Sequence, residues 1–159
     1  WKEIAMTEII KNVEFSDFYL TMIRILKLIE IFENKDKYML IKRKIVMFDY
    51  YMRFPFMTDE ERDKQNFDEK YAFYFWKPNY ALYDAVLTIL VSKEFVSCEE
   101  GSYSINKKGK TVLEHMDCEY MKTLEEAGKY VLNTVTKMSE KRIEEDIIEK
   151  SNCRREGIY

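Results

Sequence analysis

The order of helix, hairpin and helix in the second half of this chain constrains its fold more than any other feature. Residues 79–93 predict a helix buried on one side, because apolar residues recur at steps of three and four: Leu82, Val86, Ile89 and Leu90. Two short strands, over 95–97 and 103–105, are predicted on either side of a turn that contains Gly101. The sequence therefore predicts a small β-hairpin directly after a helix.

Chain breakers are scarce, which favours helices elsewhere as well: the 159 residues include four glycines and two prolines. A helix is predicted over 16–32, with Ser16 as its N-cap, after a weakly specified lead-in over 1–12. A second helix is predicted over 37–51. It must end before Pro55, because a proline disfavours the α conformation of the residue that precedes it.

The part of the chain after the hairpin is predicted to be helical. Asn106 is the expected N-cap of a helix over 107–116. A longer helix should follow, because apolar residues form one stripe: Tyr120, Leu124, Ala127, Val131, Val135 and Met138. Ser139 is then placed to cap a last helix. We expect a mainly α chain with a small β-hairpin, organised as a domain over 1–116 and a C-terminal helical extension over 117–159 that packs on this domain or on a partner.

Composition limits the classes of function. The chain has 29 acidic and 26 basic residues, a net charge of −3, and so carries no global signal for nucleic-acid binding. No apolar run approaches the length that a transmembrane helix requires. The three cysteines form no Cys-x-x-Cys motif and no even disulfide framework, which is typical of reduced thiols in a cytosolic protein. These features predict a cytoplasmic protein that does not associate with membranes.

No motif indicates catalysis, and we expect the chain not to be an enzyme. His115 is the only histidine, and neither a nucleophile elbow nor a glycine-rich phosphate loop occurs. A structural zinc site is the one metal hypothesis, with His115, Cys118, Cys98 and Cys153 as its possible ligands. Their spacing lacks the paired ligand loops of such sites, so we favour ordinary thiols and a surface histidine. The sequence predicts no metal and no cofactor.

Two short basic runs are the candidate nucleic-acid contacts: Lys42, Arg43, Lys44, Lys107, Lys108 and Lys110. Phosphate binding requires several clustered cations. The predicted helix over 79–93 carries only Lys93 and Asp84, and the hairpin turn carries Glu99 and Glu100. The six cations are therefore at least as well explained as solvent-exposed charges that keep the protein soluble.

Two apolar groups are the candidate partner interface. The first is the aromatic run 71–76, with Tyr71, Phe73, Phe75 and Trp76, which could also be a short strand or loop that covers the core. The second is the stripe of the helix after residue 119, with Tyr120, Leu124 and Val131. A long stripe of this kind could also join two copies of the chain, as in dimeric DNA-binding regulators.

Three blocks carry a resemblance to a known family: KIVMFDYYMRFPF over 44–56, YDAVLTILVSKEFV over 83–96 and YSINKKGK over 103–110. The last two resemble winged-helix proteins, in which a helix leads into a hairpin and then into a strand followed by a glycine and a lysine. With the first block in front, the order is similar to the middle component of bacterial ABC-three-component systems, which include Lamassu-type anti-phage defence. The resemblance covers roughly residues 17–116.

The resemblance implies a winged-helix-like domain over 1–116 and a small non-enzymatic subunit. Such a subunit would link an SMC-like or Rad50-like ABC ATPase to an effector, often a nuclease, in an anti-phage or anti-plasmid complex. DNA would be bound through the complex. The alternative is a winged-helix DNA-binding transcriptional regulator, which would need a basic reading surface.

Overall fold

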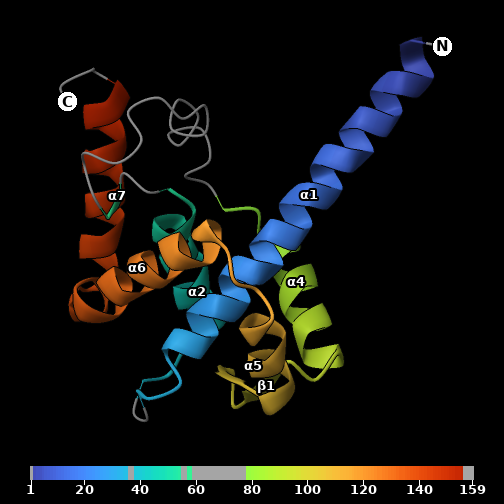
Figure 1. Ribbon diagram of the computed structural model, residues 1–159. Helices are drawn as coiled ribbons and strands as arrows, with labels where there is room; N and C mark the ends of the chain where they lie inside the picture. Colours follow the sequence, from blue (N-terminus) through green and yellow to red (C-terminus); the bar gives the residue numbers. More distant parts are fainter. Residues whose placement is uncertain (1, 36–37, 55–56, 59–77, 156–159) are drawn as a thin grey trace.

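The computed structural model describes residues 2–35, 38–54, 57–58 and 78–155, and side chains within these ranges from residue 17 to residue 151. Its elements are the helices α1 (Lys2–Ile31), α2 (Lys42–Arg53) and α4 (Tyr80–Ser92), the strands β1 (Val96–Glu99) and β2 (Ser102–Ile105), the helices α5 (Lys107–Glu114) and α6 (Glu119–Asn133), the 3₁₀ turn η2 (Val135–Lys137) and the helix α7 (Glu140–Arg155). The prediction of a mainly α fold with one small antiparallel hairpin is confirmed (Figure 1).

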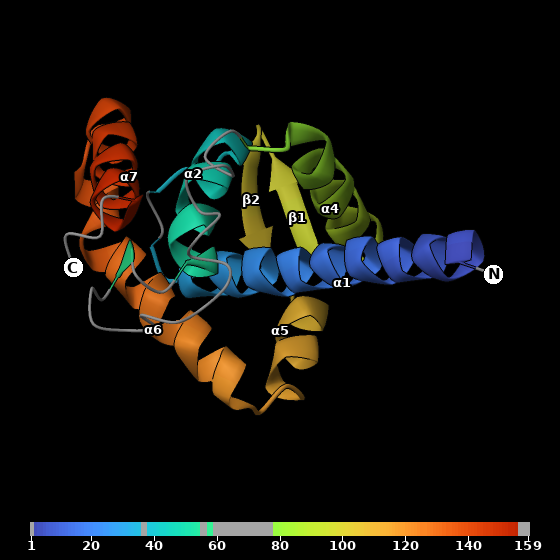
Figure 2. The ribbon, with the colours of Figure 1, turned by 90° about the horizontal axis from the view of Figure 1, so that it is seen from above.

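Helix α1 is the axis around which the other elements are arranged. Figure 2 shows α2, α4 and the hairpin on one side of α1, and α5 and α6 on the other side. The N-terminal half of α1 extends beyond the rest of the molecule (Figures 1 and 2). The predicted lead-in over 1–12 is wrong for residues 2–12, which are helical, and Ser16 lies inside the helix instead of capping it. No glycine or proline interrupts this stretch, so the helix continues through it.

Helix α2 begins five residues later than predicted, because the chain before it pairs with the hairpin. Ile41 forms an antiparallel bridge with Ser102, and the backbone N–H of Tyr103 donates to the carbonyl of Leu40 at 3.0 Å. Residues 40 and 41 therefore pair with β2 as a short third segment of the sheet. The helix then continues to Arg53, directly before an extended residue that precedes the proline, as predicted.

The hairpin is confirmed, and its turn is tighter than predicted. Its register pairs Val96 with Ile105 and Glu99 with Ser102, which leaves a two-residue turn. Both turn residues have positive φ, 51° at Glu100 and 78° at Gly101. Such a turn matches the twist of the two strands and favours glycine at its second position.

Asn106 does not cap helix α5 as predicted, although it occupies the N-cap position. Its side-chain oxygen accepts a hydrogen bond from the Ser97 hydroxyl at 2.6 Å, and its amide donates to the carbonyl of Glu94 at 3.1 Å. The side chain therefore braces the base of the hairpin. Close packing of α5 on this base also requires Gly109, because a Cβ there would clash with the carbonyl oxygen of Phe95.

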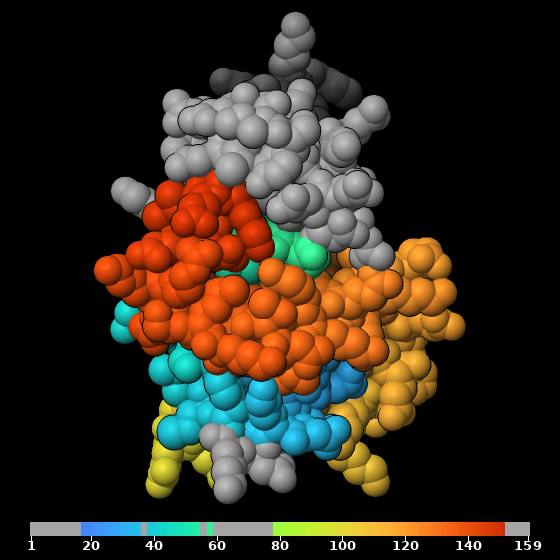
Figure 3. Space-filling view, turned by 90° about the vertical axis from the view of Figure 1, so that its left-hand side faces the viewer, coloured from blue at the N-terminus to red at the C-terminus, as the bar shows by residue number. Residues whose placement is uncertain are grey.

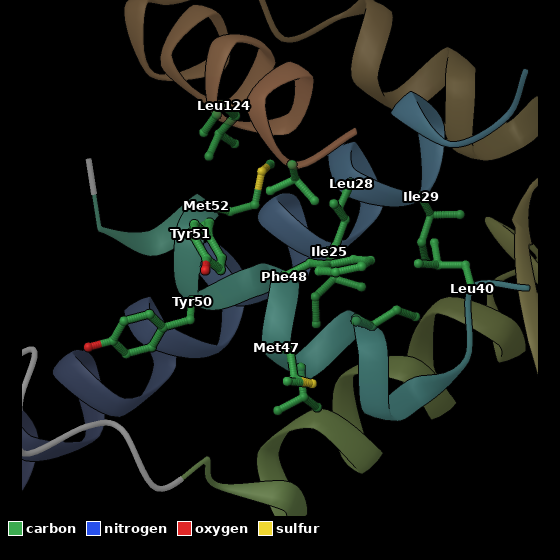
Figure 4. Close-up of a cluster of buried hydrophobic side chains, with 14 of the residues drawn as sticks. Ile25, Leu28, Ile29, Leu40, Met47, Phe48, Tyr50, Tyr51, Met52 and Leu124 are labelled. Atoms are coloured by element: carbon green, nitrogen blue, oxygen red, sulfur yellow. The ribbon is translucent and has the colours of Figure 1, made fainter. Parts of the chain in front are cut away.

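Helix α2 lies at the centre of the core. Its residues from Ile45 to Met52 are all buried. Figure 4 shows Phe48 of α2 against Ile25 of α1, and Leu124 of α6 near Met52. Helices α1, α2, α4 and α6 thus contribute to one hydrophobic cluster, which also reaches β1, α5 and α7.

The C-terminal helices pack on this core. Helix α6 ends at Asn133 rather than continuing to residue 138, and η2 follows it. The predicted Ser139 cap is confirmed, because its hydroxyl accepts from the backbone N–H of Arg142 at 3.2 Å. Helix α7 is joined to α2 by a hydrogen bond of 2.6 Å from the Tyr51 hydroxyl to Asp146. Figure 3 shows α6 and α7 side by side on one face of the molecule.

A buried polar network joins α1, α2 and α4. The guanidinium of Arg24 binds Asp49 through two nitrogens, at 2.9 and 3.1 Å, and also donates to the Thr21 hydroxyl at 3.0 Å. The Tyr83 hydroxyl donates to the same carboxylate at 2.7 Å. Thr21, Arg24 and Asp49 are at most 4% exposed. Each helix therefore contributes a polar group whose partner lies on another helix.

Replacement of Asp49 by Asn should destabilise the fold strongly, because it leaves the Arg24 charge buried without its counterion. We expect the free energy of unfolding, measured by urea denaturation, to fall by about 3–5 kcal/mol. The matched control is Asp84→Asn, which breaks an exposed ion pair and should cost no more than about 1 kcal/mol. Equal effects of the two substitutions would contradict the assigned role of Asp49.

Stability should decrease above pH 10 because of buried tyrosines. Burial, and then the neighbouring Asp49, raise the pKa of Tyr83; burial and Asp146 raise the pKa of Tyr51. A folded-state pKa above the unfolded value of about 10 means that this stability is complete below pH 10 and is lost as the pH rises further. Phenolate absorbance should show that these tyrosines ionise together with unfolding, and ionisation in the folded state near pH 10 would contradict this.

Candidate interaction surface between helix α4 and the hairpin

A shallow groove lies between helix α4 and the tip of the hairpin. Its volume is about 560 Å³, and we call it the α4–hairpin groove; its lining residues are Lys42, Asp84, Leu87, Thr88, Val91, Ser92, Cys98, Gly101 and Tyr103. Four elements form it: the start of α2, helix α4 from Asp84 to Ser92, and the strands β1 and β2 near their turn. All of these residues belong to the part of the chain that the structure describes.

The amphipathic character of α4 determines which of its side chains are exposed beside the groove. The N-cap Asn79 fixes the start of the helix by accepting a hydrogen bond from the backbone N–H of Leu82 at 3.2 Å. The buried face of α4 carries Tyr83, Val86, Leu87 and Leu90. The opposite face is exposed and combines four small side chains with three larger ones: Ala81, Ala85, Thr88 and Ser92, and Tyr80, Asp84 and Val91. Asp84 is therefore the one charged residue on the exposed face of α4.

Two charged residues line the groove, Lys42 and Asp84, and three more are exposed beside it: Lys93 after α4, and Glu99 and Glu100 at the hairpin tip. At the start of the groove the Lys42 ammonium lies 2.7 Å from Asp84, and the two charges offset one another. At the hairpin tip Glu99 and Glu100 are exposed, and within the described residues neither forms an ion pair. Burial, and then Cys98 across the strand pair, raise the pKa of the Tyr103 hydroxyl. Tyr103 therefore stays neutral and contributes an uncharged wall.

The six cations predicted as nucleic-acid contacts do not gather on one surface. Figure 2 shows their helices, α2 and α5, on opposite sides of α1. Four are in ion pairs: Lys42 with Asp84, Arg43 with Glu140, Lys108 with Glu94 and Lys110 with Glu33. Lys44 donates to the Tyr38 hydroxyl at 3.0 Å and lies over its ring. Lys107 has no ion pair among the described residues.

The predicted partner interface is corrected in part. Tyr71, Phe73, Phe75 and Trp76 lie outside the described residues. Leu124 and Val131 have no exposed surface, because α6 turns them toward α1 and α2, and they are core residues rather than a surface for a partner. Tyr120, at the start of α6, is 37% exposed.

The residues considered as metal ligands are separate within the described part of the chain. His115 Nδ1 lies 2.7 Å from the carbonyl of Thr111, and Cys98 and Cys118 are exposed on different elements. The side chain of Cys153 is outside the described set. Among the described residues, no three histidine, cysteine, aspartate or glutamate side chains come together as a possible ligand set. None of the described helices has the length and apolar character needed to cross a bilayer.

A second cavity of about 360 Å³ lies between α2, α4 and α7. Its lining includes Arg43, Tyr50 and Tyr83, whose polar groups already bind Glu140, Ser151 and Asp49 respectively. These three contacts stabilise the fold, and the lining also includes the charged residues Arg53 and Glu144.

Comparisons with protein-family models, with curated proteins and with solved structures found no match. The residues of this chain and their arrangement are therefore the basis of its proposed function.

Sequence reasoning identified the elements of the groove but not the groove itself. The low charge of residues 79–93, which carry only Asp84 and Lys93, and the acidic turn were visible in the sequence. The pairing of Lys42 with Asp84 was not, because these residues are 42 positions apart and no local pattern links them. The spacing of Ala81, Ala85, Thr88 and Ser92 was the signal that would have indicated a smooth exposed face.

The isolated chain should bind duplex DNA only weakly. We expect a Kd no tighter than about 10⁻⁴–10⁻⁶ M at physiological salt, the range of non-specific binding, because the exposed cations are dispersed and mostly paired. Fluorescence anisotropy with labelled duplexes at several salt concentrations measures this. Nanomolar binding that is lost when Lys107, Lys108 and Lys110 are all replaced by Glu would contradict the expectation.

Proposed function

We propose that this chain is a non-enzymatic protein-binding subunit of a bacterial anti-phage or anti-plasmid complex. In this proposal it links an SMC-like or Rad50-like ABC ATPase to an effector such as a nuclease, in the cytoplasm. The observation that carries the protein-binding part is the exposed face of α4, on which Asp84 is the one charged residue and is paired with Lys42, together with the acidic hairpin tip, whose Glu99 and Glu100 form no ion pair within the described residues. The classes of the two partners rest on the sequence resemblance alone.

The order of the elements supports a winged-helix-like domain within this proposal. Three helices, α1, α2 and α4, precede the hairpin, and residues 40–41 add a short edge to β2. In a winged helix of the DNA-binding kind, the helix before the hairpin enters the major groove and the hairpin approaches the backbone. By their order in the chain, helix α4 and the turn at Glu100 would take these two roles in the proposed domain.

Charge favours protein over DNA as the partner of this surface. Neutralising phosphates requires several free lysines or arginines. The groove has one lysine, Lys42, which is paired with Asp84, and the tip adds Glu99 and Glu100. Protein interfaces, in contrast, have uncharged centres and charged residues at their rims. The alternative, a DNA-binding regulator, is supported only by the order of the elements.

Co-expression with the proteins encoded beside this chain tests the proposed function. We expect a stable complex on size-exclusion chromatography that contains a coiled-coil ABC ATPase, and we expect protection against phage or plasmid to be lost when this subunit is deleted. A chain that elutes alone, from a locus whose other proteins include no ATPase, would contradict the proposal. Tight sequence-specific duplex binding by the isolated chain would favour the regulator instead.

A further inference from the structure

We propose that α7 is a detachable helix: it opens from α2 as a unit while α1, α2, α4 and α6 stay packed, and its opening uncovers the hydroxyl groups of Tyr50 and Tyr51. This opening is a property of the chain alone and is separate from the proposed function. Two features of α7 carry the inference: its small apolar contact with the core, and the polar groups that complete its attachment.

Helix α7 buries few apolar side chains for its length. Over residues 140–151, the part of α7 with described side chains, the buried apolar residues are Ile143 and Ile147, at 3% and 0% exposed. Ile148 is 44% exposed. In α2, by comparison, seven apolar or aromatic residues are buried between Ile45 and Met52. Because apolar burial is the main favourable contribution to packing, α7 is held less strongly than the core helices.

Hydroxyl groups of two tyrosines join the middle of α7 to α2. Asp146 accepts a hydrogen bond of 2.6 Å from the Tyr51 hydroxyl, and the hydroxyl oxygens of Ser151 and Tyr50 lie 3.0 Å apart. All four groups can form hydrogen bonds with water when α7 opens. The net contribution of such contacts to stability is therefore modest, although each of them defines the docked position of α7.

Near its two ends, α7 is attached to the core by charged side chains. Glu140 pairs with Arg43 of α2 at 2.7 Å, and the two side chains are 35% and 64% exposed. An ion pair as exposed as this one contributes little to stability. The Lys150 ammonium donates to the carbonyl of Met57 at 2.9 Å. Water can replace the partner of each charge as α7 opens.

The remaining charges of α7 do not depend on the core. Eight of the twelve residues 140–151 are charged, and several pair within the helix: Lys141 with Glu145 at 4.0 Å, and Arg142 with Glu149 at 3.3 Å. Figures 1 and 2 show α7 at the edge of the molecule. It follows η2 through Met138, whose backbone is extended, so α7 can move without breaking the backbone hydrogen bonds of α6.

Hydrogen exchange of the native full chain tests whether α7 opens. A detached helix of this length is only marginally stable in water, so opening allows its amides to exchange. Under conditions in which exchange rates report opening equilibria, we expect the slowest amides over 143–151 to be at least about tenfold less protected than the slowest amides of α2.

Two matched substitutions show whether α7 opens alone. Ile147→Val in α7 and Ile25→Val in α1 remove the same group from side chains that are both 0% exposed. Ile147→Val should accelerate exchange of the α7 amides about two- to tenfold. Ile25→Val should accelerate the α2 amides by a similar factor and leave the α7 amides unchanged, because Ile25 stays buried when only α7 opens.

Three results would overturn the inference: α7 amides as well protected as those of α2, no acceleration of α7 by Ile147→Val, or equal acceleration of both helices by Ile25→Val. The last result would show that α7 opens only when the whole chain unfolds. None of the three bears on the proposed function, which co-expression tests separately.

Discussion

The bidentate ion pair between Arg24 and Asp49 is the interaction on which the packing of the helices in this protein depends. Two opposite charges are withdrawn from water in the centre of a helical core, and such charges are tolerated only when their partners are placed accurately. Tyr83 donates to the same carboxylate, so that α4 is held in a defined rotation against α1 and α2. Within the described residues, no buried side-chain polar atom lacks a partner, which indicates a fully satisfied network.

The orientation of α4 determines which of its faces reaches the solvent. The buried network of Arg24, Asp49 and Tyr83 therefore influences the proposed interaction surface, because it fixes this orientation. With Tyr83 directed into the core, the line of small residues through Thr88 is directed outward. The hairpin is fixed independently, by the backbone pairing of residues 40 and 41 with β2 and by the Asn106 side chain at its base. Two separately fixed walls produce a groove of defined shape, and a preformed groove binds a partner at a lower entropic cost than a flexible one.

Local chemistry was predictable from the sequence, and contacts between distant residues were not. The hairpin, Gly101 in its turn, α4 and the Ser139 cap follow from rules that act over a few residues. The later start of α2 was missed because it depends on a bridge from Ile41 to Ser102, 61 positions away. Periodicity identified Leu124 and Val131 as an apolar stripe, but it could not indicate whether the stripe faces the core or a partner. Asp49, an isolated acid in an apolar helix, was the visible sign of the buried network.

Hydrogen exchange of the chain, alone and in its multi-protein complex, tests most directly the claim that this surface binds protein. The account predicts slower exchange of backbone amides in the second half of α4 and in β1 on complex formation, and no change in those amides when duplex DNA is added to the isolated chain. Unchanged exchange there within an intact complex, or protection of α4 by DNA alone, would contradict it.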